Sequence, residues 1–69
     1  GSIWVTVPVE HELRAYARDG KLLRSVKPVE TTPPFETPLG IAVDEPAARV
    51  VFTDLGGRLH RVPLRLPSG

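Results

Sequence analysis

Few side chains in this chain are suited to hold a metal ion. Asp44 and Asp54 each end a short apolar run, and carboxylate oxygens are ligands that Ca²⁺ accepts. Aspartates at the ends of strands also accept hydrogen bonds from turn N–H groups, and we expect this role for both. The sequence therefore offers Asp44 and Asp54 as metal candidates, without a complete set of ligands around either.

The two histidines are candidates for different chemistry, His11 as a metal ligand and His60 as a general base. His11 stands between Glu10 and Glu12, but three adjacent residues of a strand or turn do not converge on one ion, so we expect a solvated turn there. His60 lies in an alternating segment, and we expect it at the surface or against a partner rather than as a general base. Neither histidine has an orienting partner that the sequence makes obvious.

Nucleophiles and phosphate-binding loops are missing from the sequence. The chain has no cysteine, and Ser2, Ser25 and Ser68 lack the Gly-x-Ser-x-Gly context of a nucleophile elbow. Gly56-Gly57 stands alone and predicts a tight turn rather than a phosphate cradle. We therefore predict no catalytic and no cofactor-binding residue in this chain.

Charge does not indicate a nucleic-acid partner. Nine basic and eight acidic residues leave a net charge of +1. Arg58, Arg61 and Arg65, with His60, form a modest basic cluster without interleaved aromatic residues, so we expect a solvated strand edge that resists aggregation.

The sequence does not indicate a membrane partner or a cellular compartment. No apolar run reaches the roughly 18 residues that cross a bilayer, and no signal peptide is recognisable. Gly1-Ser2 has the composition of a tag scar.

Alternation and turn residues predict six short strands, at residues 3–7, 12–18, 21–26, 40–44, 49–54 and 58–64. Asp19-Gly20 between the second and third strands is a strong hairpin signal. Residues 27–39 are rich in proline and threonine, so we expect an extended connection without a helix, in which Phe35 anchors the loop. The organisation is thus two meanders, residues 3–26 and 40–69.

The two meanders form a loose internal repeat. Ile3-Trp4-Val5-Thr6 recurs 47 residues later as Val50-Val51-Phe52-Thr53, and Leu13-Arg14-Ala15-Tyr16 recurs 46 residues later as Leu59-His60-Arg61-Val62. Repeats of about 40–50 residues built from short strands are typical of β-propeller blades. A single blade cannot bury both of its faces, so the repeat favours a larger assembly.

These segments resemble blades of the SMP-30/gluconolactonase/strictosidine-synthase-like β-propellers, which are related to NHL and YWTD repeats. The similar phrases run from Pro38 to Asp44, from Val50 to Asp54 and from Gly57 to Val62, with a further phrase ending at Asp19-Gly20-Lys21-Leu22-Leu23. The resemblance implies an all-β fold, an antiparallel β-meander of about one and a half propeller-type blades. By this comparison the chain lacks an inner strand at its start and an outer strand at its end.

The resemblance also bears on metal chemistry. Lactonases of this group bind a divalent metal through an Asn or Asp that stands where this chain has Leu39. Leucine offers no oxygen to a hard cation. Calcium or zinc, and a small-molecule ligand, would then belong to other blades of the parent propeller.

Three functions follow as alternatives. The first is a non-catalytic propeller segment that works by assembly, its partners being the remaining blades or further copies of itself. The second is a part of a metal-dependent lactonase or esterase completed by other blades. The third is an independent small β interaction domain. In all of them we expect eight apolar side chains to be mostly buried, either within the chain or against a partner: Trp4, Val5, Leu13, Leu22, Ile41, Val43, Val51 and Phe52.

Overall fold

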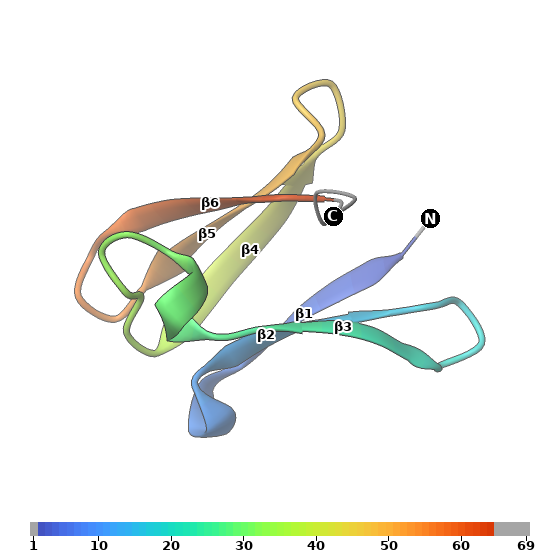
Figure 1. Cartoon of the computed structure of the whole chain (residues 1–69), viewed down its shortest axis with the longest axis horizontal. Coiled ribbons are helices and arrows are strands. Elements are labelled where there is room, and N and C mark those ends of the chain that lie inside the picture. Colours follow the sequence, from blue (N-terminus) through green and yellow to red (C-terminus); the bar gives the residue numbers. More distant parts are fainter. Residues whose placement is uncertain (1, 65–69) are drawn as a thin grey trace.

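The computed structural model describes residues 2–64 and shows six antiparallel strands in two three-stranded sheets (Figure 1). Sheet 1 has the order β1 (Ile3–Val7), β2 (Glu12–Tyr16), β3 (Leu22–Val26). Sheet 2 has the order β4 (Pro38–Asp44), β5 (Arg49–Asp54), β6 (Leu59–Pro63). The prediction of an all-β antiparallel meander is confirmed. No helix within the described residues is long and apolar enough to cross a membrane.

Two turns of 3-10 helix interrupt the strands, η1 (Pro8–Glu10) and η2 (Pro28–Glu30). Each begins with a proline, whose fixed φ suits the first position of a helical turn. The connection after β3 was expected to contain no helix, and η2 corrects that expectation by a single turn. The Glu30 side chain holds this turn by accepting the Lys27 N–H at 2.8 Å.

The hairpin turns explain why several strands are shorter than expected. Residues 12–18 were predicted as one strand, but β2 ends at Tyr16, because Ala17 begins the turn and receives the Gly20 N–H at 2.9 Å. Gly20 and Gly57 adopt φ of +92° and +82°, a region where a side chain is strained. β4 begins earlier than predicted, at Pro38, where a bulge between Pro38 and Ile41 shifts the register.

The two sheets lie face to face and share one core (Figure 1). Between the two sheets, the main contact between strands is made by the edge strands β1 and β4. Arg24 of sheet 1 also reaches sheet 2, where its Nη1 donates to the Pro63 carbonyl at 2.8 Å, and its guanidinium lies 5.5 Å from the centre of the Trp4 ring. The core residues come from both sheets and the connecting loop: Trp4, Leu13, Ala15, Val26, Phe35, Val50, Phe52 and Val62.

The internal repeat extends to the pairing of the strands. Trp4 pairs with Ala15 in sheet 1, as Val51 pairs with Arg61 in sheet 2. The other three pairs of the repeat agree in the same way: Ile3–Tyr16 with Val50–Val62, Val5–Arg14 with Phe52–His60, and Thr6–Leu13 with Thr53–Leu59. The two copies therefore have one register.

Equivalent residues of the two sheets nevertheless bury opposite faces. Val50 is fully buried in the core, whereas its equivalent Ile3 is 52% exposed. In the other direction Leu13 is fully buried, whereas its equivalent Leu59 is 53% exposed. Each sheet thus contributes a different face to the shared core, as in a stack in which the front of one sheet covers the back of the next.

The predicted core is confirmed in part. Trp4, Leu13 and Phe52 are buried, as is the loop anchor Phe35. Three more of the eight, Val5, Ile41 and Val51, are only half-buried. Leu22 and Val43 are 51% and 40% exposed, so they are not buried within the chain, and their burial against a partner stays a prediction. Leu22 pairs with Tyr16 on the face of sheet 1 that is turned away from the core, and Val43 lies near the end of the edge strand β4.

Candidate functional site

Asp54 is the centre of a buried polar group that joins several segments of the chain. It ends β5, and its Oδ1 accepts the N–H of Arg58 at 3.0 Å in the turn that leads to β6. Its Oδ2 accepts the N–H of Glu36 at 3.0 Å, just before β4, and meets His60 Nε2 of β6 at 2.8 Å. One carboxylate therefore joins β5, the turn after it and β6 to the approach loop, residues 31–37, which leads into β4.

These donors keep the carboxylate charged. The N–H groups of Arg58 and Glu36 hold the pKa of Asp54 well below its usual 3.8; burial opposes this shift and His60 adds to it. Because an ionised carboxylate only accepts hydrogen bonds, Nε2 of His60 carries the proton between them. Asp54 and His60 thus form a charge-assisted buried hydrogen bond.

His60 is part of the aromatic core, contrary to the prediction of a surface position. Its ring stacks on Phe52, with centroids 5.2 Å apart, and Phe35 meets Phe52 edge to face at 4.9 Å. The His60 side chain is only 4% exposed. The prediction failed because β6 alternates, so the residue two before the buried Val62 also faces the core.

Thr31 fixes the approach loop around this cluster. Its hydroxyl donates toward the Pro33 carbonyl at 2.9 Å and accepts the N–H of Phe35 at 3.0 Å. Phe35 is thereby held against Phe52. Asp54 and His60, although an acid–base pair in type, join the loop before β4 to the hairpin of β5 and β6.

The two metal candidates do not come together. Asp44 and Asp54 lie at opposite ends of sheet 2, since Asp44 pairs with Arg49 at the first residue of β5 and Asp54 is its last. Five steps along a strand separate these ends by about 17 Å. Asp44 is bound by Arg49 Nε at 3.1 Å. Among residues 2–64, no cluster of three or more histidine, aspartate or glutamate side chains is suited to hold a metal ion.

The remaining candidates are exposed or engaged elsewhere. His11 lies in a turn with φ of +54° and is exposed, as expected. Glu12 beside it is buried, and its carboxylate accepts a hydrogen bond from Arg14 Nε at 2.6 Å. Glu12 and His11 therefore do not face a common ion. Leu39, which we expected to offer no metal ligand, is 47% exposed. Arg58 and Arg61 are exposed, and Arg65 lies outside the described residues.

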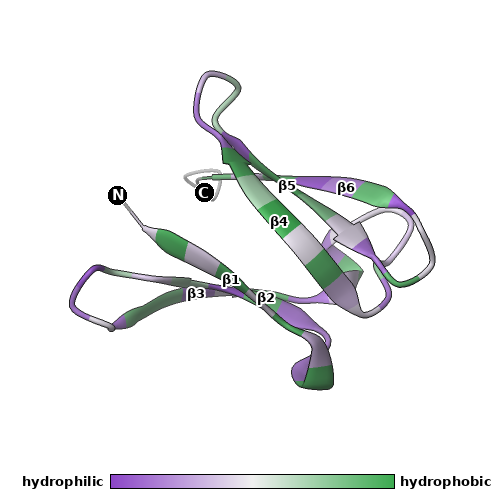
Figure 2. Cartoon of the chain, turned by 180° about the vertical axis from the view of Figure 1, so that it is seen from behind, coloured by the Kyte–Doolittle hydropathy of each residue, from purple (hydrophilic) through white to green (hydrophobic). Residues whose placement is uncertain are grey.

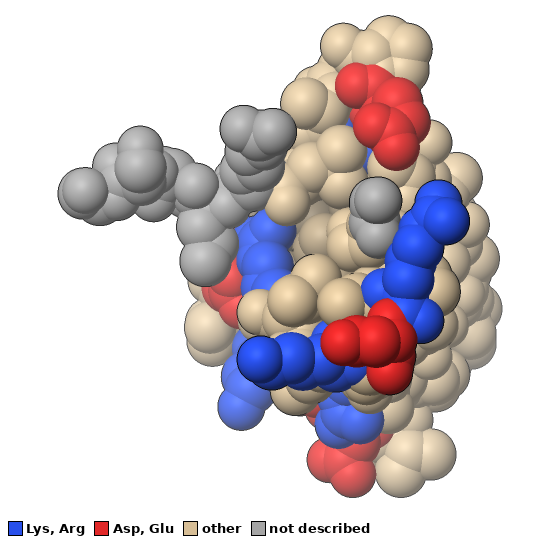
Figure 3. All heavy atoms as spheres, turned by 90° about the vertical axis from the view of Figure 1, so that its right-hand side faces the viewer, with Lys and Arg blue, Asp and Glu red and all other residues tan. Residues whose placement is uncertain are grey.

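A second candidate site is the outer face of sheet 1, the face turned away from the core. The register places Ile3, Val5, Tyr16 and Leu22 on it, with Arg14 among them. Ile3 and Leu22 are about half exposed and the other three are half-buried. In Figure 2 the ribbon of β1, which contributes Ile3 and Val5, carries green hydrophobic segments. In the view of Figure 3, basic and acidic side chains lie next to one another amid uncharged surface, without a large area of one sign.

No family model, curated protein or solved structure matches this chain. A proposal for the function of this chain therefore rests on its internal register and on the contacts within the molecule.

Sequence analysis missed the contact between Asp54 and His60. A signal for it was present: Val50, Phe52 and Asp54 alternate along β5, as His60 and Val62 do along β6. Applying the period of two strictly would have placed Asp54 and His60 on the buried face with the apolar residues. Their types, which usually favour the surface, concealed this.

Proposed function

We propose that this chain is a non-catalytic assembly segment, which works by stacking against a further β-sheet. The observation that carries the proposal is the shared register of the two sheets combined with their opposite burial. Ile3, Val5 and Tyr16 on the outer face of sheet 1 are the equivalents of Val50, Phe52 and Val62, which lie in the core. The outer face of sheet 1 is thus equivalent to the face of sheet 2 that sheet 1 covers in the core.

The chemistry of the partner follows from the same equivalence. The face that covers Val50, Phe52 and Val62 presents Trp4, Leu13 and Ala15. A sheet that covers the outer face of sheet 1 would present a similar set, with a large apolar side chain beside a small one. The resemblance to propeller blades agrees with this proposal, since blades cover one another in series.

The partner we infer is another segment of a larger assembly rather than a second copy. On the outer face of sheet 2, Arg61 stands where sheet 1 has Ala15. A guanidinium covered by an apolar sheet without a counter-ion loses hydration that the contact does not replace. The outer face of sheet 1 is mainly apolar and its Arg14 is paired with Glu12, whereas Arg61 makes the outer face of sheet 2 resist the same partner.

This difference gives a direct experiment. Arg61→Ala supplies sheet 2 with the residue found at the equivalent buried position, and it should allow copies to stack head to tail. One sheet face of three strands and five residues spans only about 240 Å², so the contact will be weak and should be measured up to about 0.5 mM. We expect at least about tenfold tighter self-association than in the parent chain, or about 1.4 kcal/mol.

Two further substitutions identify the surface responsible. Val5→Lys in the Arg61→Ala background places a charge on the outer face of sheet 1 and should return the protein to a monomer. Val29→Lys is the matched control, because Val29 lies in η2, away from either face, and is 86% exposed. Equal effects of both lysines, or a monomeric Arg61→Ala variant at every concentration, would contradict the proposal.

A further inference from the structure

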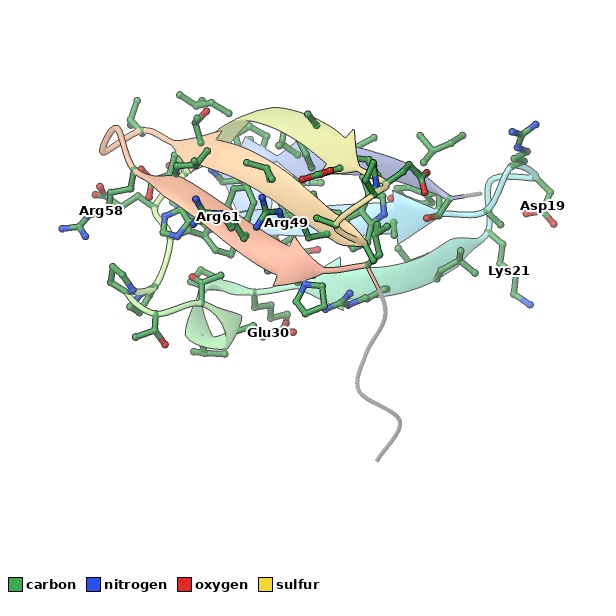
Figure 4. All side chains as sticks on the ribbon, turned by 90° about the horizontal axis from the view of Figure 1, so that it is seen from above. Asp19, Lys21, Glu30, Arg49, Arg58 and Arg61 are labelled. Carbon is green, nitrogen blue, oxygen red and sulfur yellow. The ribbon has the colours of Figure 1, made fainter. Side chains whose placement is uncertain are left out.

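The free edge of β6 borders a groove. β6 pairs only with β5, so its other edge has no neighbouring strand among the described residues. Between this edge and the loop of residues 30–33 lies a hollow of about 430 Å³. Residues 58–61 form one wall and residues 30–33 the other. Figure 4 shows Arg61 on β6 and Glu30 on the neighbouring turn, with Arg58 at the end of the hairpin.

The backbone of this edge offers hydrogen bonds to the groove. Toward β5, the Arg58 carbonyl accepts the Asp54 N–H at 3.1 Å, and the Leu64 N–H donates to the Ala48 carbonyl at 2.9 Å. The β5–β6 register runs without a shift between these points. Because successive residues of a strand point their backbone groups to opposite sides, Leu59 and Arg61 direct N–H and C=O away from β5.

The open stretch is short and has a defined end. Within residues 2–64, no hydrogen bond is formed by the outward N–H or C=O groups of Leu59 or Arg61. Pro63, the next outward residue, has no N–H, and its carbonyl already accepts Arg24 Nη1. A strand added at this edge would therefore pair with Leu59 and Arg61 and stop there.

The charges of the groove select the chemistry of such a strand. Arg58 and Arg61 contribute two positive charges, and Glu30 contributes one negative charge while its Oε2 accepts the Lys27 N–H. Exposed guanidinium groups bind carboxylates in a paired geometry. We propose that the groove binds an extended acidic peptide segment, which adds a short strand to β6. This surface differs from the outer face of sheet 1, so the inference does not depend on the proposed function.

The probe is an acetylated and amidated peptide, Val-Glu-Val-Glu-Val, whose two carboxylates fall on one face of a strand. The measurement is amide hydrogen exchange of the full chain by NMR, with and without saturating peptide. We expect exchange of the Leu59 and Arg61 amides to slow at least about tenfold, as hydrogen-bonded amides do. The His60 and Val62 amides, which point to β5, should change little. Equal protection of all four would overturn strand addition.

Two comparison ligands separate the contributions. A Val-Lys-Val-Lys-Val peptide should bind at least about tenfold more weakly, and equal binding would refute the role of Arg58 and Arg61. Acetate at the same ionic strength tests for a bare anion site. If acetate alone reproduced the protection of Leu59 and Arg61, strand addition would be wrong.

Variants at one position test backbone and charge separately. Arg61→Gln removes the charge, keeps the N–H, and should lower affinity for the acidic peptide about two- to fivefold. Arg61→Pro removes both the charge and the N–H, and we expect it to lower the affinity for the acidic peptide at least about tenfold. Proline is tolerated at edge strands but has no N–H to donate. Arg18→Gln, at an exposed arginine outside the groove, is the control and should bind normally. Full affinity in both Arg61 variants would overturn the proposal.

Discussion

Replacing Phe52 by alanine tests the core and the repeat together. Phe52 is 1% exposed and contacts Phe35 and His60. A phenylalanine buries about 150–250 Å², which at about 25 cal/mol per Å² corresponds to about 4–6 kcal/mol. Alanine still buries part of this area, so the expected loss in the free energy of unfolding is about 3–5 kcal/mol.

The size of this loss matters because the chain is small. At about 0.05–0.15 kcal/mol per residue, 69 residues give a total stability of about 3–10 kcal/mol. Phe52→Ala therefore removes a large fraction of the stability and leaves a protein that is partly or wholly unfolded. Phe52→Leu conserves more volume and should cost less than about 1.5 kcal/mol, which keeps its transition measurable.

The matched control is Val5→Ala, at the equivalent position of sheet 1. Val5 is half-buried on the outer face, so losing its methyl groups should cost less than about 1 kcal/mol. Urea unfolding followed by the fluorescence of Trp4, the single tryptophan, measures all three variants. Losses of similar size for Val5→Ala and Phe52→Ala, or a loss under about 1 kcal/mol for Phe52→Ala, would refute the opposite burial of the two sheets.

Two further predictions concern the polar contacts of sheet 2. Because N–H donors lower the folded-state pKa of Asp54 below its usual value of 3.8, the stabilisation by its charged form is complete above that value and is lost as pH falls toward the folded pKa. Between about pH 4 and pH 2 the urea midpoint of the parent chain should fall. At about pH 2.5 the Asp54→Asn variant should take up fewer protons on unfolding than the parent chain, by up to one proton. Equal proton uptake in both proteins would contradict this. Thr31→Val should cost about 1–3 kcal/mol because the Phe35 N–H loses its acceptor, whereas Thr32→Val at the exposed neighbour should change stability by less than about 0.5 kcal/mol. Equal losses would show that the Thr31 hydroxyl does not hold the loop.

The sequence predicted the fold class and the number of strands because alternation and turn residues are local signals. It placed Trp4, Leu13 and Phe52 in the core correctly. It did not show that Leu22 and Val43 are exposed within the chain, because an apolar residue in a strand gives no information on whether the sheet face that it occupies is covered. The resemblance to propeller blades stays a prediction.

The candidate site was harder to predict than the fold. Asp54 was expected to accept hydrogen bonds from a turn, and it does so from Arg58. Its other partners, the Glu36 N–H and the His60 ring, come from a distant loop and the next strand. The contact between the two sheets also decides which outer face stays uncovered. A repeat in the sequence shows which residues are equivalent, but it does not show how the two sheets pack.

Sedimentation equilibrium of Arg61→Ala beside Arg61→Ala/Val5→Lys tests the central claim most directly, because both proteins differ only on the outer face of sheet 1. The account predicts a concentration-dependent increase in mass for the single variant, at least about tenfold tighter than in the parent chain, and a monomer for the double variant. The same mass for both variants at every concentration would contradict it.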